Sequence, residues 1–353
     1  ETLKKFNNVK KIVRGMGRSY GDSSFQKNLT ISTKKLDKII MFEKDKGLIK
    51  VQTGVTIDKL LKLTIPHGWF MPVTPGSKFV SIGGAISADV HGKNHHIDGS
   101  IYNFINNISF IDKNNKLIKC SHSENKNLFN QLVGGMGLFG MIIDIELKLL
   151  KIENKYIFLK KQLYNDLNSI LSSFNKFHSW KYTVAWIDFM AEDCEKIRGI
   201  LFKGRHASNK EIPKSLLNNK LKPTKSKGLT IFFKFPNFFL NNFTIKIFNL
   251  LYFNINRISK TKIVDYESFF YPLDKINNWN NLYGKDGFMQ YQFVIPEKNC
   301  NIGIREVFKL LISKKCFSFL TVIKKLGKKN NSILSFPEPG ITITLDFKNN
   351  VLN

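Results

Sequence analysis

Residues 72–103 are the stretch that most constrains what this chain can fold into, because glycines, small residues and three histidines crowd into it with few large side chains. Glycine lets the backbone approach a bound group closely, and successive amide N–H groups in such segments can point at an anion. The stretch is not typical of a hydrophobic core. It predicts the cradle of a large cofactor that carries phosphate. Its motifs are Pro72-Val73-Thr74-Pro75-Gly76, Ser81-Ile82-Gly83-Gly84-Ala85, His91-Gly92-Lys93-Asn94-His95-His96 and Asp98-Gly99-Ser100.

The 353-residue chain changes character near residue 152, and its length suits two domains. Before that point, short strand patterns alternate with glycine turns; after it, glycine becomes rarer and aromatic residues increase. We predict an α+β protein with domains at 1–152 and 153–353. Both ends look cut, so we expect a fragment. The expected helices are 57–65, 124–131 and 163–177, and the expected strands include 39–42, 47–53, 141–149, 180–190, 288–295 and 341–347. Residues 302–313 and 318–324 are expected to form either strands or helices.

Two glycine turns flank the central stretch. Gly15-x-Gly17-x-x-x-Gly21 follows a strand pattern, but Tyr20 stands where the dinucleotide fingerprint requires its third glycine, and no helix pattern follows. A Rossmann fold is therefore not expected, and a turn that donates N–H groups to a pyrophosphate is favoured over a plain turn. The second turn, 135–140, matches the fingerprint but leads into a strand pattern. We interpret it as close packing against the same cofactor.

The chain carries a net charge of +28, which attracts anions such as nucleic acid, an anionic membrane or a phosphorylated substrate. A general bias toward Lys, Asn, Ile and Phe explains the excess equally well, because the Lys residues are scattered. A basic nucleic-acid-binding protein is the weaker hypothesis, since the sequence has no nucleic-acid-binding motif.

Residues 229–255 hold eight Phe and only two charges, Lys234 and Lys246. We expect mostly core there, with membrane contact as the alternative.

His91, His95 and His96 are the candidate chemical groups of the central stretch. With Asp89 and Asp98 they offer metal-ligand types, but the surrounding glycines suit a cofactor better, so no metal site is expected. The ordinary pKa of histidine, ~6.5, suits His91 to hydrogen bonding or acid–base catalysis beside that cofactor.

The four cysteines are far apart without a Cys-x-x-Cys motif, which indicates free thiols in a reducing, cytoplasmic compartment.

Gln290 and Gln292 lie on an expected strand, where a period of two puts both amides on one face. Paired amides suit recognition of hydroxyl groups, as in a sugar, although a solvated strand face is the simpler interpretation. Lys324 ends the apolar run 317–323. It could meet a substrate phosphate or carbonyl oxygen, or be an ordinary exposed lysine.

Taken together, these residues resemble the decaprenylphosphoryl-β-D-ribose 2-oxidase family of vanillyl-alcohol-oxidase-type flavoproteins over nearly the whole chain. The motifs that carry the resemblance are Arg14-Gly15-Met16-Gly17-Arg18-Ser19-Tyr20-Gly21-Asp22, Pro72 to Gly76, Gly83 to His96, Val133 to Gly140, Gln290 to Pro296, Lys324, Leu334 to Pro337 and Asp346-Phe347.

The resemblance implies a two-part PCMH-type FAD-binding domain and a substrate domain with an antiparallel sheet and flanking helices. A final segment that returns to the FAD domain would lie beyond Asn353. The FAD would be non-covalent, because Arg18 and Tyr20 stand where related oxidases often have a linking histidine. The implied FAD-binding residues are Gly15, Gly17, Arg18, Ser19, Tyr20, Gly21, Asp22, Gly76, Ser81, Ile82, Gly83, Gly84, Ala85, His91, Gly92, Lys93, Asn94, His95 and Ile142.

The same resemblance implies oxidation of the 2-hydroxyl of a polyprenyl-phosphate-linked ribose to a 2-keto sugar. Gln290, Gln292 and Lys324 would face the ribose and its phosphate. Tyr20 or His91 would take the hydroxyl proton, with Lys324 polarising the oxygen. A partner short-chain reductase would complete a 2-epimerisation to arabinose for the cell envelope, with the enzyme in the cytoplasm and in peripheral contact with the inner membrane face. An oxidase of a soluble sugar, aldonolactone or alditol is the alternative within this fold.

Overall fold

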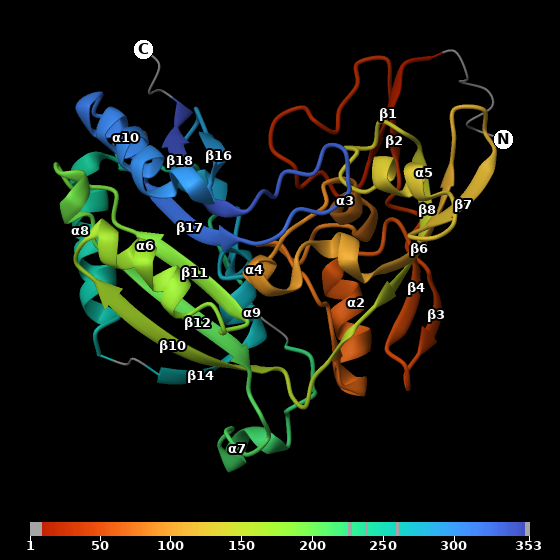
Figure 1. Ribbon diagram of the computed structural model, residues 1–353, viewed down its shortest axis with the longest axis horizontal. Helices are drawn as coiled ribbons and strands as arrows, with labels where there is room; N and C mark the ends of the chain where they lie inside the picture. Colours follow the sequence, from red (N-terminus) through yellow and green to blue (C-terminus); the bar gives the residue numbers. More distant parts are fainter. Residues whose placement is uncertain (1–8, 225–227, 237–238, 259–260, 350–353) are drawn as a thin grey trace.

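The computed structural model describes residues 9–349 except 225–227, 237–238 and 259–260. Two α/β units lie side by side, each built on its own sheet, and the chain passes from the first to the second between β9 and β10 (Figure 1). The predicted α+β class is confirmed. Among the described residues, no helix is both long enough and apolar enough to span a bilayer.

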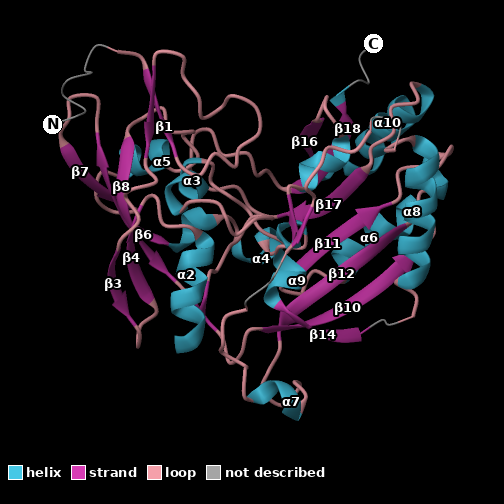
Figure 2. Ribbon diagram, turned by 180° about the vertical axis from the view of Figure 1, so that it is seen from behind, coloured by secondary structure: helices cyan, strands magenta, loops and turns pink. Residues whose placement is uncertain are grey.

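The first unit contains an antiparallel five-stranded sheet in the order β3-β4-β8-β6-β7 and a parallel pair, β1 and β2. Helices α2 and α3 pack on the sheet (Figure 2). The elements are β1 (Lys11–Arg14), β2 (Leu29–Ser32), β3 (Ile39–Glu43), β4 (Leu48–Gln52), α2 (Ile57–Thr64), β5 (Trp69–Phe70), α3 (Ile82–Ser87), α4 (His95–Asp98), β6 (Ile105–Ile111), β7 (Leu117–Ser121), α5 (Lys126–Leu132), β8 (Met141–Lys148) and β9 (Leu150–Lys151).

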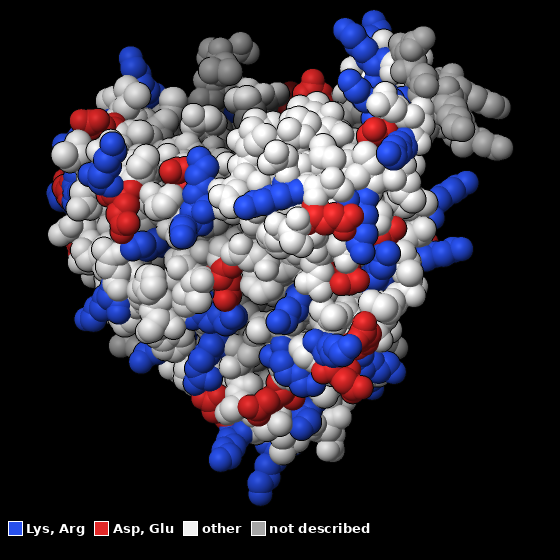
Figure 3. Space-filling view, turned by 45° about the vertical axis from the view of Figure 1, so that its right-hand side comes forward, with Lys and Arg blue, Asp and Glu red and all other residues white. Residues whose placement is uncertain are grey.

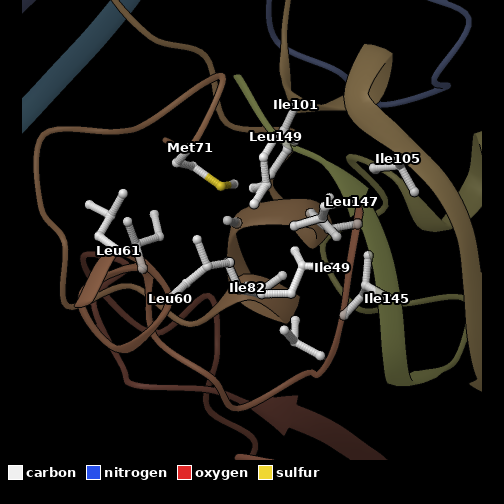
Figure 4. Packing of buried hydrophobic residues seen from close by; sticks show 14 of the residues in the cluster. Ile49, Leu60, Leu61, Met71, Ile82, Ile101, Ile105, Ile145, Leu147 and Leu149 are labelled. Atoms are coloured by element: carbon white, nitrogen blue, oxygen red, sulfur yellow. The ribbon is translucent and has the colours of Figure 1, made fainter. Parts of the chain in front are cut away.

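Helix α3 corrects the expectation that the central stretch builds no core. Ser81 caps its N-terminus by accepting a hydrogen bond from the Gly84 N–H at 3.3 Å. The turn then places Ile82, Ala85 and Ile86 on one side, where all three are fully buried. Figure 4 shows Ile82 among the aliphatic side chains of this core. The glycines occupy the other positions, so one short helix serves both the core and a concave surface.

The second unit is a fully antiparallel seven-stranded sheet in the order β14-β10-β12-β11-β17-β18-β16. Helices α6 and α10 pack on one face, and α8 packs on the other (Figures 1 and 2). The elements are β10 (Tyr156–Tyr164), α6 (Leu167–Lys176), β11 (Tyr182–Ile187), β12 (Gly199–His206), α7 (Lys214–Leu217), β13 (Leu229–Thr230), α8 (Asn242–Ile255), β14 (Thr261–Asp265), α9 (Tyr266–Phe270), β15 (Ile276–Asn277), β16 (Phe288–Pro296), α10 (Cys300–Ser313), β17 (Leu320–Leu326) and β18 (Gly340–Lys348).

The expectation that residues 229–255 are mostly core is wrong for the residues described there. In α8 only Asn249 and Phe253 are buried. A single stripe of the helix packs on the sheet, against Trp186 of β11 and Ile200 of β12, and the remaining apolar side chains face outward.

Polar contacts join the two units. Lys78 forms a buried ion pair with Glu267 of α9 and a second ion pair, at 3.0 Å, with Asp58 of α2. The β17–β18 loop, residues 327–339, crosses to the first unit (Figure 1). There Asn330 and Ser335 donate hydrogen bonds to the carboxylate of Asp89, which is completely buried. These contacts fix the position of the two units relative to each other.

Candidate active site

The glycine turns enclose a cavity of about 280 Å³ in the first unit, here called the glycine cavity. Three segments meet at it: the turn after β1, the N-terminal part of α3, and the turn before β8. Of the residues implied to bind FAD, those that line it are Gly15, Gly17, Arg18, Ser19, Ser81, Gly83, Gly84 and Ile142.

Steric room explains the glycines. A Cβ on Gly83 would lie 1.7 Å from Thr53 Oγ1, and one on Gly15 would lie 2.1 Å from Ser81 Oγ. Gly17 has a φ of +62°, a conformation that residues with a Cβ rarely adopt. The glycines therefore let the turn after β1, Thr53 and α3 pack closely, and their backbone forms part of the cavity wall, which suits the close approach of a pyrophosphate.

A second cavity, of about 550 Å³, lies between the first unit and the open face of the large sheet; we call it the sheet cavity. Pro75 lines both cavities, so they adjoin. Gly76, His91, Gly92 and Lys93 form its wall on the side of the first unit. Its opposite wall is mostly apolar and comes from β10, β11, β12, β17, α8 and α9. That wall includes Leu159, Val184, Trp186, Phe202, Phe248, Tyr252, Phe269, Leu320 and Val322.

Strand register brings polar groups together on this face of the sheet. Gln290 pairs with Asp346 and Gln292 with Thr344 between β16 and β18, and Lys324 of β17 pairs with Thr342. Because side chains alternate along strands, these residues share one face, as the period of two predicts for the glutamines. Gln290 Nε2 donates to Asp346 Oδ1 at 2.7 Å, and Gln292 Nε2 donates to Thr342 Oγ1 at 3.0 Å.

His91 faces this group from the first unit. Its Nε2 lies 3.4 Å from Gln292 Nε2, and its ring stacks on Phe336 of the β17–β18 loop with centroids 5.7 Å apart. Desolvation, followed by the charge of Lys324 and by His95, holds the pKa of His91 well below its ordinary value. A neutral imidazole beside the sheet cavity can accept a proton at neutral pH.

Two lysines bring positive charge into the sheet cavity. Lys93 Nζ donates to the carbonyl oxygen of Phe269, and desolvation together with Lys324 lowers the pKa of Lys93 to about 7. Desolvation lowers the pKa of Lys324 to about 8. Within the described residues, the Lys324 ammonium has no hydrogen-bond or ion-pair partner, so it is available to an anion in the cavity.

Sequence comparison agrees with this geometry. The FAD binding domain family matches residues 2–121. The decaprenylphosphoryl-beta-D-ribose oxidase of Mycolicibacterium smegmatis is 33% identical over 347 residues, which cover 95% of this chain and 74% of that protein. The chain belongs to the decaprenylphosphoryl-β-D-ribose oxidase family. It is an FAD-dependent oxidoreductase, and the glycine cavity suits the pyrophosphate of FAD because Gly15, Gly17 and Gly84 bring backbone into its wall.

Two further relatives are similar over shorter spans. The D-lactate dehydrogenase of Anaerostipes hadrus is 23% identical over a region that covers 51% of this chain and 39% of that protein. The Delta(24)-sterol reductase of Homo sapiens is 24% identical over 42% of this chain and 28% of the enzyme. The matches to the FAD binding domain and to the oxidase favour an enzyme over the hypothesis of a basic nucleic-acid-binding protein. In Figure 3, the Lys and Arg side chains on the visible face are interspersed with Asp and Glu.

Several residues implied to bind FAD line neither cavity. The side chains of Ile82 and Ala85 lie in the core, so only their backbone is free to approach a cofactor. The Asn94 amide donates to the Pro72 carbonyl oxygen and to Asp98, and His95 Nδ1 accepts a hydrogen bond from the Gly327 N–H at 2.9 Å. The polar groups of Asn94 and His95 are thus engaged by the protein itself, and their contact with FAD stays a prediction. Within the described residues, the histidines and acidic residues form no cluster that could hold a metal.

Tyr20, Gly21 and Asp22 belong to an exposed loop beside the site. The Tyr20 ring is 54% exposed and meets Phe288 edge-on with centroids 5.4 Å apart. Partial desolvation and the nearby Asp346 carboxylate raise the pKa of Tyr20 to about 12. The phenol therefore stays protonated at neutral pH, which favours His91 over Tyr20 as a proton acceptor. Gly21 and Asp22 remain predicted cofactor contacts.

Asp346 is the site residue for which the sequence predicted no role. It is 1% exposed and hydrogen-bonded to Gln290, and desolvation raises its pKa to about 6. The strand pattern around Asp346 gave no indication of its partner, because Gln290 lies 56 residues away in the sequence. The signals in the sequence were the family motif Asp346-Phe347 and a carboxylate within a strand pattern.

Replacing Asp346 with asparagine should stabilise the protein at alkaline pH. A raised carboxyl pKa means that the folded state loses stability as pH rises from about 4 to 6, and the penalty persists above pH 6. The shift corresponds to roughly 3 kcal/mol, which Asp346→Asn should recover at pH 8 but not at pH 4. Denaturant unfolding at both pH values measures this gain. Asp45→Asn, in an exposed turn, is the control; an equal gain at pH 4 and pH 8 would contradict the assignment.

Proposed function

We propose that this protein oxidises the 2-hydroxyl of a polyprenyl-phosphate-linked ribofuranose to the 2-keto sugar, the first half of a 2-epimerisation to arabinose for the cell envelope. The observation that carries the proposal is the Lys324 ammonium, which has no partner among the described residues and lies in a largely apolar cavity that adjoins the FAD cradle, on the same sheet face as the two glutamine amides. The named substrate of the Mycolicibacterium smegmatis relative has this chemistry: an anionic group, a sugar with hydroxyls and a long hydrocarbon chain.

Each part of such a substrate has a complementary group in the sheet cavity or on the sheet face beside it, where Gln290 and Gln292 lie. Gln290 and Gln292 offer amide groups to the ribose hydroxyls, and the Lys324 ammonium attracts the phosphate or the reacting oxygen. The apolar wall from β10 to β12 suits the first isoprene units, because it removes hydrocarbon from water. A soluble sugar would leave that wall uncovered, which favours the lipid-linked substrate over the free one.

The residues of this chain would handle the proton in the reaction. His91, neutral at pH 7, would accept the proton of the 2-hydroxyl, while Phe336 and Gln292 hold its ring in place. Lys324 would stabilise the oxygen as it loses that proton. Bound FAD supplies the acceptor for the hydride that leaves the 2-carbon. Tyr20 remains the second candidate base.

We further propose a short-chain reductase as the partner that reduces the 2-keto sugar, because a 2-epimerisation requires a second hydride transfer to the opposite face. A lipid-linked substrate also favours a cytoplasmic enzyme in peripheral contact with the inner membrane face. The positive net charge of +28 suits contact with anionic lipid.

FAD should be released when the protein is denatured. Arg18 and Tyr20 occupy the first glycine turn, and neither is a residue that commonly forms a link to flavin. Acid precipitation of the yellow protein should leave the flavin absorbance, at roughly 370 and 450 nm, in the supernatant. Yellow colour retained in the pellet would indicate a covalent bond and contradict this expectation.

The proposed reaction is tested by mixing the FAD-loaded protein anaerobically with a polyprenylphosphoryl ribose and following the 450 nm band. Bleaching by the lipid-linked sugar but not by free ribose or ribose 5-phosphate is expected. Bleaching by a free sugar, aldonolactone or alditol, with hydrogen peroxide formed in air, would instead establish the soluble-sugar oxidase.

A further inference from the structure

Helix α8 carries an unpartnered apolar surface, here called the α8 ridge: Phe243, Ile247, Leu250, Leu251 and Ile255. These side chains are 71%, 44%, 47%, 56% and 64% exposed. Their spacing of i, i+4, i+7, i+8 and i+12 places them on one side of the helix. Phe232 and Phe233, just before the helix, are also exposed, at 87% and 64%. A contiguous apolar surface of this kind marks an interaction site.

The opposite stripe of α8 is firmly packed, so the ridge has a fixed outward direction. Phe253 packs against Trp186 and Ile200 of the sheet. The Asn249 amide donates to Asp188 Oδ1 at 2.7 Å, and both residues are buried. The helix cannot bury its ridge by rolling over without breaking these contacts.

The electrostatic surroundings of the α8 ridge are basic. The described part of the segment 228–264 has the basic residues Lys234, Lys246, Arg257 and Lys262 and no acidic residue. Beside Ile247 and Leu250, a hollow is lined by Lys196, Arg198 and Lys246 as well as by Asp188, Glu192 and Asp193. Arg257 also borders a hollow that it shares with Lys160 and Lys161. A hydrophobic ridge with a fringe in which cations outnumber anions is complementary to an anionic bilayer surface. It is poorly suited to a second copy of itself, because the two fringes would repel each other.

The α8 ridge is also continuous with the sheet cavity. Phe248, Tyr252 and Asn256, on the flank of the same helix and just after it, line that cavity. The Phe248 and Tyr252 rings stack with centroids 5.9 Å apart. Hydrocarbon could therefore pass from the ridge into the cavity along an apolar surface, without crossing a polar rim.

We propose that the α8 ridge inserts into the surface of an anionic bilayer and places the mouth of the sheet cavity against the lipid, so that a membrane-held polyprenyl phosphate enters along α8. The role in substrate delivery rests on the proposed function, whereas the membrane binding does not. Insertion buries the apolar ridge, and the cationic fringe adds attraction to acidic headgroups.

The binding test uses the FAD-loaded protein and sedimentation with sucrose-loaded vesicles of phosphatidylglycerol and phosphatidylcholine. Phe243→Gln, Leu251→Gln and Ile255→Gln are combined in one variant, since none of the three lines the sheet cavity. The variant should partition at least tenfold more weakly than the wild type. The control combines Leu117→Gln, Ile302→Gln and Leu310→Gln, which are 63%, 70% and 58% exposed on β7 and α10. It should bind like the wild type.

Equal loss in both variants, or no binding by the wild type, would overturn the proposal. A dimer that forms with rising concentration in sedimentation velocity and is lost in the α8 variant, without vesicle binding by the wild type, would assign the ridge to a second copy. That result would also overturn the proposal of membrane insertion.

A second experiment, flavin bleaching, separates the membrane inference from the proposed function. The α8 variant should be as fast as the wild type with a short-chain, water-soluble polyprenylphosphoryl ribose, and slower only with the long-chain lipid in vesicles. Absence of bleaching by every lipid-linked ribose, with vesicle binding intact, would refute the function and leave the membrane surface standing.

Discussion

Replacement of Lys324 by methionine is expected to slow flavin reduction by the lipid-linked sugar by about 10²–10³-fold, the range found when one charge-stabilising group is removed from a water-poor site. The ammonium lies inside the sheet cavity without a partner among the described residues, so removing it leaves no structural anion unpaired. Anaerobic stopped-flow absorbance at 450 nm measures the rate. The fold should persist, because methionine fills the same space without a desolvated charge.

The pH dependence of the same reaction identifies the group. With a pKa of about 8, Lys324 loses its charge as pH rises through 8, so kcat/KM of the wild type should fall above that pH. Lys324→Met should lack this alkaline limb. Lys325→Met is the matched control, since the neighbouring side chain points to the other face of the sheet and pairs with Glu297 at 3.0 Å. A normal rate in Lys324→Met, or equal losses in both variants, would exclude the assigned role.

The second large effect is expected at Gly83. A methyl group there would lie 1.7 Å from Thr53 Oγ1 and 3.1 Å from the Thr53 carbonyl oxygen, so α3 or β4 must shift. Gly83→Ala should lower the free energy of unfolding by about 1–3 kcal/mol, the usual cost of overpacking. It should also weaken FAD binding, because the displaced backbone forms the wall of the glycine cavity. Urea unfolding of the apoprotein and fluorescence titration with FAD measure the two effects.

Gly76→Ala provides the comparison for Gly83. Gly76 also borders a cavity, but nothing lies within 4 Å of the Cβ it would gain. Its stability should change little, by less than about 0.5 kcal/mol, as for substitutions away from packed features. If Gly83→Ala were as stable as Gly76→Ala and retained FAD equally well, close packing would not be the reason for glycine at residue 83.

Local patterns predicted the elements that position the site. Thr56 caps α2 by accepting a hydrogen bond from the Lys59 N–H, as the sequence around 57–65 indicated. The alternation around Gln290 and Gln292 correctly placed both amides on one face of β16. Both features depend on residues close in sequence, for which helical and strand periodicity are direct signals.

Long-range pairing was beyond these signals. Phe336 meets His91 only because the β17–β18 loop crosses between the units, and Asp346 meets Gln290 only through strand register. The orientation of α8 was missed for a related reason. Its composition is that of a core helix, and only the structure shows that no further layer of described residues covers the side of α8 that faces away from the sheet.

The attachment of the β17–β18 loop to Asp89 has a consequence for modularity. The carboxylate of Asp89 is fully buried, and its side-chain donors Asn330 and Ser335 come from more than 240 residues later in the chain. A nucleotide-binding module cut away from this hairpin would keep a buried carboxylate deprived of those donors, which is strongly destabilising. A chimaera that exchanges the substrate sheet for that of another flavoprotein must therefore transplant the hairpin loop as well. The loop stabilises the first unit, which it contacts through Asp89, although in the sequence it lies within the second unit.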